Sequence, residues 1–178
     1  GLDEAIEFEL PKDFLANNDI DAVIICSPHT LHYQHASDAI AAGKHVLVEK
    51  PLTCTSEDGE ALIAQAKEAG KILQVSFQRH FMPAYMYIRS AIASGAIGRL
   101  TSINATLYQD WKDNQHGTWR QNPKLSGGGM LMDSGSHIID VLLWTTGLTV
   151  ESVQTQLHQQ GTPVEVDTFT TIRFREGQ

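Results

Sequence analysis

The stretch Asp21-Ala-Val-Ile-Ile-Cys-Ser27, which is closed by Pro28, decides the fold. A short, continuous apolar run of this kind is typical of a strand that is buried on both faces of a parallel sheet. Outward from it, residues 30–42 carry apolar side chains at helical spacing and stop at Gly43, a natural position for the end of a helix. His45-Val-Leu-Val-Glu49 then predicts a second buried strand.

The same alternation continues for one more helix and one more strand. Residues 55–69 predict a helix with Thr55 or Ser56 as its N-cap, and Lys71-Ile-Leu-Gln-Val-Ser-Phe77 predicts the third strand. Strands and helices that alternate through short connections form half of a doubly wound α/β sheet with right-handed crossovers. We therefore expect residues 1–78 to be part of a Rossmann-like parallel sheet.

The pattern changes after Phe77, which indicates a second domain. Leu100-Thr-Ser-Ile-Asn-Ala-Thr-Leu-Tyr108 alternates apolar and polar side chains, as in a strand of a sheet with one solvated face. The other expected elements are a helix near 83–94, a polar loop at 110–128, an apolar helix at about 134–146, and strands at 150–158 and 167–175. We expect residues 79–178 to form an incomplete α+β domain with a mainly antiparallel open sheet.

The bulk composition narrows the kind of partner. The 178 residues carry 21 acidic against 13 basic side chains, a formal net charge of −8, and no block of Lys or Arg. We therefore expect a small-molecule partner rather than nucleic acid or a membrane. No apolar run approaches the ~20 residues that a membrane span requires. Cys26 and Cys54 lack metal or redox spacing, which favours reduced thiols in a cytoplasmic protein over a disulfide.

Glu49-Lys50-Pro51 lies where a predicted parallel strand ends. Ligands of open α/β sheets bind at the carboxyl ends of the strands. A residue before proline is held extended, and an ammonium projected from such a turn can stabilise a developing alkoxide. Lys50 is therefore a candidate catalytic residue, and the alternative is a solvated lysine in a tight turn.

Asp133 and His137 lie four residues apart at the start of the apolar helix, so they share one face of its first turn. Histidine is the usual general base near neutral pH, and both polar groups need partners at the edge of a buried element. The alternative is that Asp133 caps the helix and His137 is a hydrogen-bonded core histidine. A metal site that adds Asp140 is disfavoured, because no second cluster with ligand spacing accompanies it.

Three other features suggest contacts with a ligand. Gly127-Gly-Gly129 lets the backbone approach either a ligand or a neighbouring strand closely. The spacing of His29, His32 and His35 raises a metal hypothesis, but the stronger interpretation is that Ser27-Pro28-His29 packs against a ligand at a strand end and that His32 and His35 belong to the helix that begins there. The three tryptophans, Trp111, Trp119 and Trp144, are interpreted as anchors of the core or of a loop and not as surfaces on which a ligand stacks. Trp119, which Arg120 follows, is the one candidate among them for contact with a substrate.

Four segments together resemble the glucose–fructose oxidoreductase, inositol dehydrogenase and MocA family. They are residues 21–32, Glu49-Lys-Pro51, Gln78-Arg-His-Phe81 and Gly127-Gly-Gly-Met-Leu-Met-Asp-Ser-Gly-Ser-His137. Their order and spacing match, and an Asp-x-x-x-His motif about 85 residues after Glu-Lys-Pro is far more specific than either motif alone. The resemblance covers almost the whole chain and implies that residues 1–78 are the C-terminal part of a dinucleotide-binding domain. It assigns residues 79–178 to substrate binding and oligomerisation.

The resemblance also implies an activity, which is hydride transfer between NAD or NADP and a carbinol carbon of a sugar, cyclitol or related polyol. Lys50 would orient the reacting oxygen, His137 would take the hydroxyl proton, and Asp133 would orient the site and tune its charge. Substrate contacts would come from Lys50, Trp119, Arg120, Asp133 and His137, with no metal. Positions that border the nicotinamide and its ribose would be Ser27, Pro28, His29, His32, Glu49, Lys50 and Gln78. His29 stands where the family more often has Asn.

One family feature does not occur in this sequence, namely the glycine-rich strand-to-helix turn that seats the pyrophosphate. The sequence therefore reads as an internal piece of a longer enzyme, expected to bind dinucleotide poorly and to be inactive by itself. Two alternatives share the scaffold: a glycosidase that retains NAD, and a non-catalytic member that binds sugar or regulates a partner. A half-covered sheet in the second domain favours a homo-oligomer for the complete protein.

Overall fold

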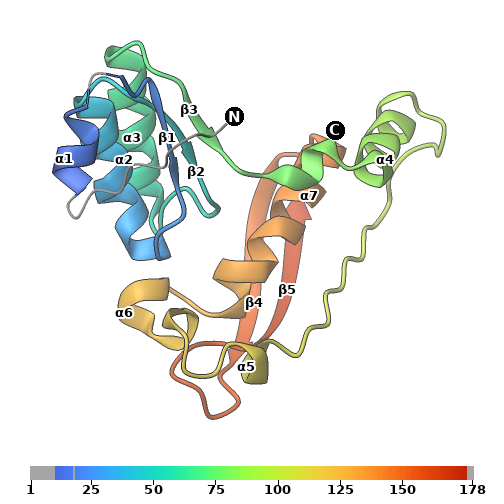
Figure 1. The fold of residues 1–178 in the computed structure, drawn as a ribbon. Coiled ribbons are helices and arrows are strands. Elements are labelled where there is room, and N and C mark those ends of the chain that lie inside the picture. Colours follow the sequence, from blue (N-terminus) through green and yellow to red (C-terminus); the bar gives the residue numbers. More distant parts are fainter. Residues whose placement is uncertain (1–10, 18, 176–178) are drawn as a thin grey trace. The chain divides into compact units, whose positions relative to one another are not determined.

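The computed structural model describes residues 11–17 and 19–175, and it falls into two compact units (Figure 1). Unit 1 comprises the chain up to Ser27 and then Leu31–Ser76. Unit 2 comprises Pro28–Thr30 and the chain from Phe77 onward. The part of the predicted nucleotide-binding half that falls on residues 1–10 lies outside the described residues.

Unit 1 is a three-stranded parallel sheet with helices, and this part of the predicted fold class is confirmed. The sheet order is β1-β2-β3, and Ala22 pairs with His45 and Val46 with Leu73. In chain order the elements of unit 1 are α1 (Pro11–Leu15), β1 (Ala22–Ile25), α2 (His32–Ala41), β2 (His45–Val48), α3 (Ser56–Glu68) and β3 (Leu73–Val75). The short helix η1 (His29–Leu31) lies between β1 and α2 in sequence, and its first two residues belong to unit 2.

Helix ends in unit 1 follow the predicted signals. Thr55 is the N-cap of α3, and its hydroxyl accepts a hydrogen bond from the Asp58 backbone N–H at 3.2 Å. Gly43 follows α2 with φ of 76°, and Gly70 follows α3 with φ of 63°. Both glycines adopt the left-handed conformation that closes a helix without a Cβ penalty.

The core of unit 1 joins one face of the sheet to α2 and α3. Its buried members come from alternate strand positions and from the two helices: Val23, Ile25, Ala36, Ala39, Ile40, Val46, Val48, Leu62 and Ala66. The expectation that β1 is buried on both faces is wrong for the described residues, because Ile24 is 72% exposed. Two consecutive right-handed crossovers place both helices on the same side of the sheet, which leaves the alternate side chains uncovered.

Unit 2 contains helices and a two-stranded antiparallel sheet, which confirms the α+β character of the second half. In β4 and β5, Val153 pairs with Ile172 and Thr155 with Thr170, and α4 packs against α7. Its elements are η2 (Gln78–Phe81), α4 (Pro83–Ala93), α5 (Trp111–Asn114), η3 (Trp119–Gln121), α6 (Pro123–Ser126), the π-helical turn η4 (Leu131–Gly135), α7 (Ser136–Thr146), β4 (Val150–His158) and β5 (Asp167–Phe174).

The strand predicted for Leu100–Tyr108 is not present. This segment runs from α4 to α5 without pairing with β4 or β5, and almost all of its side chains are exposed (Figure 1). An alternating pattern makes a strand only where a neighbour supplies the ladder hydrogen bonds. Among the described residues of unit 2, β4 and β5 pair only with each other, so 100–108 has no such neighbour.

Within residues 11–17 and 19–175, no helix is both long enough and apolar enough to cross a lipid bilayer.

Candidate active site

The carboxyl ends of β1 and β2 bring together several predicted cofactor residues in unit 1. Ser27 follows β1, and Glu49 and Lys50 follow β2, so they lie at the same edge of the sheet. His32 is completely buried between them. One of its ring nitrogens, Nε2, lies 2.9 Å from the Ser27 carbonyl oxygen, and Nδ1 lies 2.7 Å from the Pro51 carbonyl oxygen.

Other side chains around this edge are less buried. Ser27, Glu49 and Lys50 are all half-buried, and the Ser27 hydroxyl lies 2.9 Å from His35 Nδ1. The Lys50–Pro51 peptide bond is cis. A pocket of about 210 Å³ opens between α1, β1 and α2, and Ser27 and His35 are among its lining residues.

A buried carboxylate organises the candidate site of unit 2. Asp133 lies in the π-helical turn η4 and is 7% exposed. The indole N–H of Trp111, itself 3% exposed, donates to Asp133 Oδ2 at 2.9 Å. Arg120 Nε lies 3.3 Å from the same oxygen. Asp133 therefore accepts from side chains and does not cap α7, whose N-cap is Gly135 without a side-chain cap bond.

Trp119 and Arg120 join this cluster, together with His29 from the three-residue piece of unit 2. The Arg120 guanidinium lies 4.5 Å from the centre of the Trp119 ring, and the same ring meets His29 edge-on at 4.8 Å. His29 Nδ1 donates to the Ser126 carbonyl at 3.0 Å, and His29 Nε2 lies 3.9 Å from Asp133 Oδ1. The cluster therefore places an indole, a guanidinium and an imidazole around one carboxylate.

The triple glycine approaches another part of the chain rather than leaving open space for a ligand. A Cβ on Gly129 would lie 1.9 Å from the Glu165 backbone oxygen. The Glu165 carboxylate accepts from the backbone N–H groups of Gly129 at 2.7 Å and Leu131 at 3.2 Å. Since Leu131 begins the turn that contains Asp133, Glu165 anchors that turn to the segment before β5.

His137 is buried on the first turn of α7, at 9% exposure, and lies on the same face as the buried Val141 and Thr145. Farther along α7, Asp140 Oδ2 lies 2.8 Å from His80 Nε2, and the His80 ring stacks on Trp144 at 4.3 Å. Burial raises the pKa of Asp140, and the opposing effects of His80 and then Arg79 are smaller. Asp140 is therefore a partner of His80.

Metal-binding hypotheses gain no support within the described residues. No group of three or more His, Cys, Asp or Glu side chains is placed to hold an ion there. His32 and His35 both belong to α2, as the sequence predicts, whereas His29 belongs to unit 2. Cys26 and Cys54 are free thiols, and burial, followed by the charge of Asp58, raises the pKa of Cys54.

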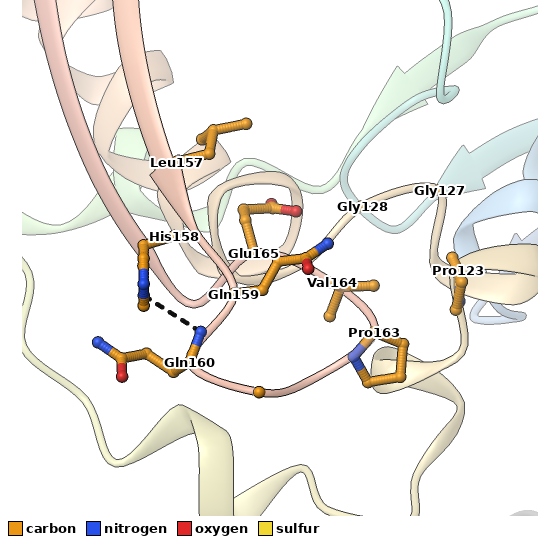
Figure 2. A pocket seen from close by; sticks show the side chains of 11 residues that line it. Pro123, Gly127, Gly128, Leu157, His158, Gln159, Gln160, Pro163, Val164 and Glu165 are labelled. Carbon is orange, nitrogen blue, oxygen red and sulfur yellow. Dashed lines mark hydrogen bonds between the residues drawn. The ribbon is translucent and has the colours of Figure 1, made fainter.

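A groove of unit 2 is lined by other residues than these candidates (Figure 2). It has a volume of about 640 Å³ and lies between the end of α6, Gly127-Gly128 and the connection from β4 to β5. Figure 2 shows Glu165 beside Gly128 and the hydrogen bond from the Gln160 N–H to His158 Nδ1 at 3.2 Å. None of the predicted catalytic or substrate residues is among those that line it.

The structure thus forms two groups of predicted residues, one in each unit. Ser27, His32, Glu49 and Lys50 gather at the strand ends of unit 1. The group in unit 2 consists of His29, Trp119, Arg120 and Asp133. His137 lies on the helix that follows Asp133, and Gln78 is exposed at the start of η2. A meeting of Lys50 with His137 stays a prediction.

Two contacts in this region are not predicted by the sequence. Trp111 is buried, in agreement with its prediction as a core or loop anchor, but its N–H also donates to Asp133. A tryptophan in an otherwise polar loop was the available signal, since a buried indole usually needs a hydrogen-bond acceptor. Glu165 gave no signal of its own, and only the triple glycine hinted that some segment approaches closely.

Two family models match the chain. One, described as the GFO/IDH/MocA C-terminal domain, matches residues 85–177. The other, described as an oxidoreductase family with an NAD-binding Rossmann fold, matches residues 3–77.

Curated relatives are similar over most of this chain. Levoglucosan dehydrogenase of Pseudarthrobacter phenanthrenivorans is 33% identical over 138 residues, which is 76% of this chain and 35% of that protein. The scyllo-inositol 2-dehydrogenase (NADP(+)) of Bacillus subtilis is 33% identical over 150 residues, which is 84% of this chain and 41% of that protein. The chain therefore spans less than half the length of these relatives.

Solved structures show the same relation. Levoglucosan dehydrogenase in complex with NADH and L-sorbose matches with a TM-score of 0.85 at 30% identity, over 95% of this chain and 48% of that chain. Aldose-aldose oxidoreductase from Caulobacter crescentus, complexed with glycerol, matches with a TM-score of 0.79 at 29% identity, over 93% of this chain and 50% of that chain.

Proposed function

Because this chain belongs to the Gfo/Idh/MocA family of oxidoreductases, we propose that the complete protein is a nicotinamide-dependent dehydrogenase or reductase. Its substrate is a sugar, a cyclitol or a related polyol, and the bond that reacts is the C–H of a carbinol carbon. The names of the relatives support this substrate class, since they include dehydrogenases of levoglucosan and scyllo-inositol. Either NAD or NADP fits the proposal.

The strand ends of unit 1 fit the nicotinamide end of such a cofactor. Ser27, Glu49 and Lys50 lie at the edge where parallel sheets bind ligands, and they are half-buried rather than sealed in the core. Pro28, also half-buried, and the exposed Gln78 would complete the contacts. His29 and His32, at 4% and 0% exposure, would act as supports. A glycine-rich turn for the pyrophosphate is not among residues 11–17 and 19–175.

The observation that carries the proposal is the Asp133 cluster. Its carboxylate is almost completely buried, yet an indole N–H and a guanidinium both point at one of its oxygens. Burying a carboxylate is costly, and its partners are charge-assisted donors that hold it in one orientation. A polar arrangement of this cost, four residues before a buried histidine, is typical of an acid–base site.

Each catalytic side chain has a separate role. The nicotinamide, when bound, supplies the acceptor or donor of the hydride. The Lys50 ammonium would orient the reacting oxygen and stabilise negative charge on it. His137 would take the hydroxyl proton in oxidation and return it in reduction. Asp133 would favour the charged form of the neighbouring base, and Trp119 with Arg120 would contact substrate hydroxyls.

We also propose a division of labour between the two halves and a self-association. Residues 1–78 would be part of the dinucleotide-binding domain, and residues 79–178 part of a domain for substrate binding and oligomerisation. Val153 and Leu157, which share one face of the β4–β5 sheet, are more than half exposed, which favours burial of that face against another surface. A homo-oligomer in the cytoplasm stays a prediction, and light scattering of the complete protein would test the assembly.

The test of the activity uses the complete reading frame. It is assayed with NAD and with NADP against a panel of polyols and aldoses, by the absorbance of the reduced nicotinamide. Lys50→Ala and His137→Ala should each lower kcat by at least about 100-fold, the scale of a lost acid–base or electrostatic contribution. His158→Ala is the matched control, because His158 lies exposed at the end of β4 and should leave turnover unchanged.

Three outcomes would contradict the proposal. Turnover that survives both substitutions unchanged would remove the assigned roles. Cleavage of glycosides without release of stoichiometric NADH would instead identify a glycosidase that retains NAD. Binding of sugar without turnover on any substrate of the panel would identify a non-catalytic family member.

A further inference from the structure

His32 has an unusual pair of hydrogen-bond partners. It is the first residue of α2, and its side chain is completely buried in unit 1. Both ring nitrogens meet backbone carbonyl oxygens: Nε2 meets Ser27 O at 2.9 Å, and Nδ1 meets Pro51 O at 2.7 Å. These distances are those of good hydrogen bonds.

The chemistry of the partners restricts the protonation of the ring. A carbonyl oxygen can only accept, and a neutral imidazole carries one N–H and one bare nitrogen. If His32 were neutral, one of the two contacts would place a nitrogen lone pair against an oxygen lone pair. Both contacts become hydrogen bonds only when both nitrogens carry hydrogen. Such charge-assisted bonds are short and strong, which offsets part of the cost of burying a cation.

The two carbonyls belong to the two turns that matter for the proposed function. Ser27 follows β1, and Pro51 directly follows Lys50. We propose that His32 is an imidazolium that ties the turn carrying Lys50 to the end of the neighbouring strand, and so acts as a positioning residue for the Lys50 ammonium. The role in catalysis rests on the proposed function, whereas the two-proton state of the ring does not.

His45 in the same unit provides an internal control. Its Nδ1 accepts a hydrogen bond from the Ile72 backbone N–H at 2.9 Å, so this nitrogen is bare and the ring is neutral. The two histidines, which both belong to unit 1, should therefore differ in the number of ring nitrogens that carry hydrogen. A nuclear magnetic resonance spectrum detects this difference.

The first experiment is nuclear magnetic resonance of the complete protein, labelled with ¹⁵N-histidine, at neutral pH. His32 should show protonated shifts and one-bond N–H couplings at both ring nitrogens, and slow exchange with water because the ring is buried. His45 should show one protonated and one bare nitrogen, and His32→Gln assigns the His32 signals by their loss. A bare nitrogen on His32 would overturn the imidazolium.

The second experiment tests positioning with three variants. His32→Leu removes both donors and should lower kcat by about 10- to 100-fold, the scale expected when a catalytic group is displaced by about an ångström. The dissociation constant of the dinucleotide should change less. His32→Gln keeps an amide with two donor hydrogens and should recover part of kcat, and His45→Gln should leave it unchanged.

The outcomes separate positioning from a purely structural role. A glutamine variant whose kcat lies between those of the leucine variant and the wild type, without a matching recovery of unfolding free energy, supports positioning. A folded His32→Leu enzyme with unchanged kcat overturns it, as does a glutamine variant no more active than the leucine variant. Should leucine prevent folding, a glutamine variant with the kcat of the wild type at lowered stability would also overturn it. If no substrate turns over, the proposed function fails, while the spectrum still decides the state of His32.

Discussion

The two units bury different kinds of side chain. Unit 1 has a contiguous apolar core between one face of its parallel sheet and two helices, with Leu62 and Val48 completely buried. The most buried residues of unit 2 are largely polar or aromatic, and two of them, Trp111 and His29, lie beside the Asp133 carboxylate, while β4 has no buried residue. Burial of apolar side chains stabilises a fold by itself. Burial of a carboxylate costs free energy, so the buried Asp133 and its donors indicate a functional role.

The strongest test of this contrast is Leu62→Ala. Leu62 is completely buried in unit 1, so the substitution should cost about 2–5 kcal/mol of unfolding free energy through lost burial and the remaining cavity. Ile63→Ala is the matched control, because Ile63 is 58% exposed and should change stability by less than about 0.5 kcal/mol. Urea denaturation followed by hydrogen exchange of unit 1 measures both, and equal effects would contradict an apolar core there.

The next test concerns the backbone of unit 2. Gly129→Ala should cost at least about 3 kcal/mol, because its Cβ would overlap the backbone at Glu165. Gly98→Ala has open space around the Cβ but a φ of 73°, so it should cost only about 1–2 kcal/mol. All three tryptophans lie in unit 2, so their fluorescence during denaturation reports on this unit. A harmless Gly129→Ala would show that the close approach to Glu165 is wrong.

A third test removes one donor from the buried carboxylate. Trp111→Phe keeps the ring but deletes the N–H that Asp133 accepts, and should cost about 1.5–3 kcal/mol, the range for a hydrogen bond to a charged group. It should also lower kcat more than it raises KM. Trp144→Phe is the control, since a phenyl ring can still stack on His80. If both variants lose the same small amount, Trp111 contributes only packing.

The smallest expected effect is a pH dependence at Asp140. Its pKa in the folded chain lies above the ordinary value of 3.8, chiefly because of burial. The folded state therefore binds this proton more tightly, and stability is lost as pH rises from about 3.8 through the raised pKa. Asp140→Asn cannot titrate, so the wild type should lose stability relative to this variant as pH rises. Parallel stability curves from acid to neutral pH would contradict the raised pKa.

Local signals in the sequence were enough for most of unit 1. Apolar runs, a Thr55 cap and glycines after helices depend on residues close in sequence, and they located the strands and helices. The exposure of one face of β1 could not be derived in this way, because it depends on which face of the sheet the helices pack against. The strand expected at 100–108 failed for a related reason, since pairing depends on a partner elsewhere in the chain.

In unit 2 the sequence indicated the right residues but few of their contacts. The spacing of Asp133 and His137 marked both as candidates, and both are buried. The partners of Asp133 come from 13 to 104 positions away, as in Arg120 and His29. Such contacts are decided by tertiary packing, and no local pattern of charge or hydropathy reports them.

The three residues Pro28–Thr30 belong to unit 2 although unit 1 surrounds them in sequence. Thr30 donates to the carbonyl oxygens of Lys124 and Leu125, and His29 donates to that of Ser126. A hybrid enzyme that joins this chain to the C-terminal half of a relative at position 76 would therefore set these side chains against a loop of different sequence. Recombination should succeed more often when the tripeptide is exchanged together with the C-terminal half, so that the exchangeable unit is discontinuous in the gene.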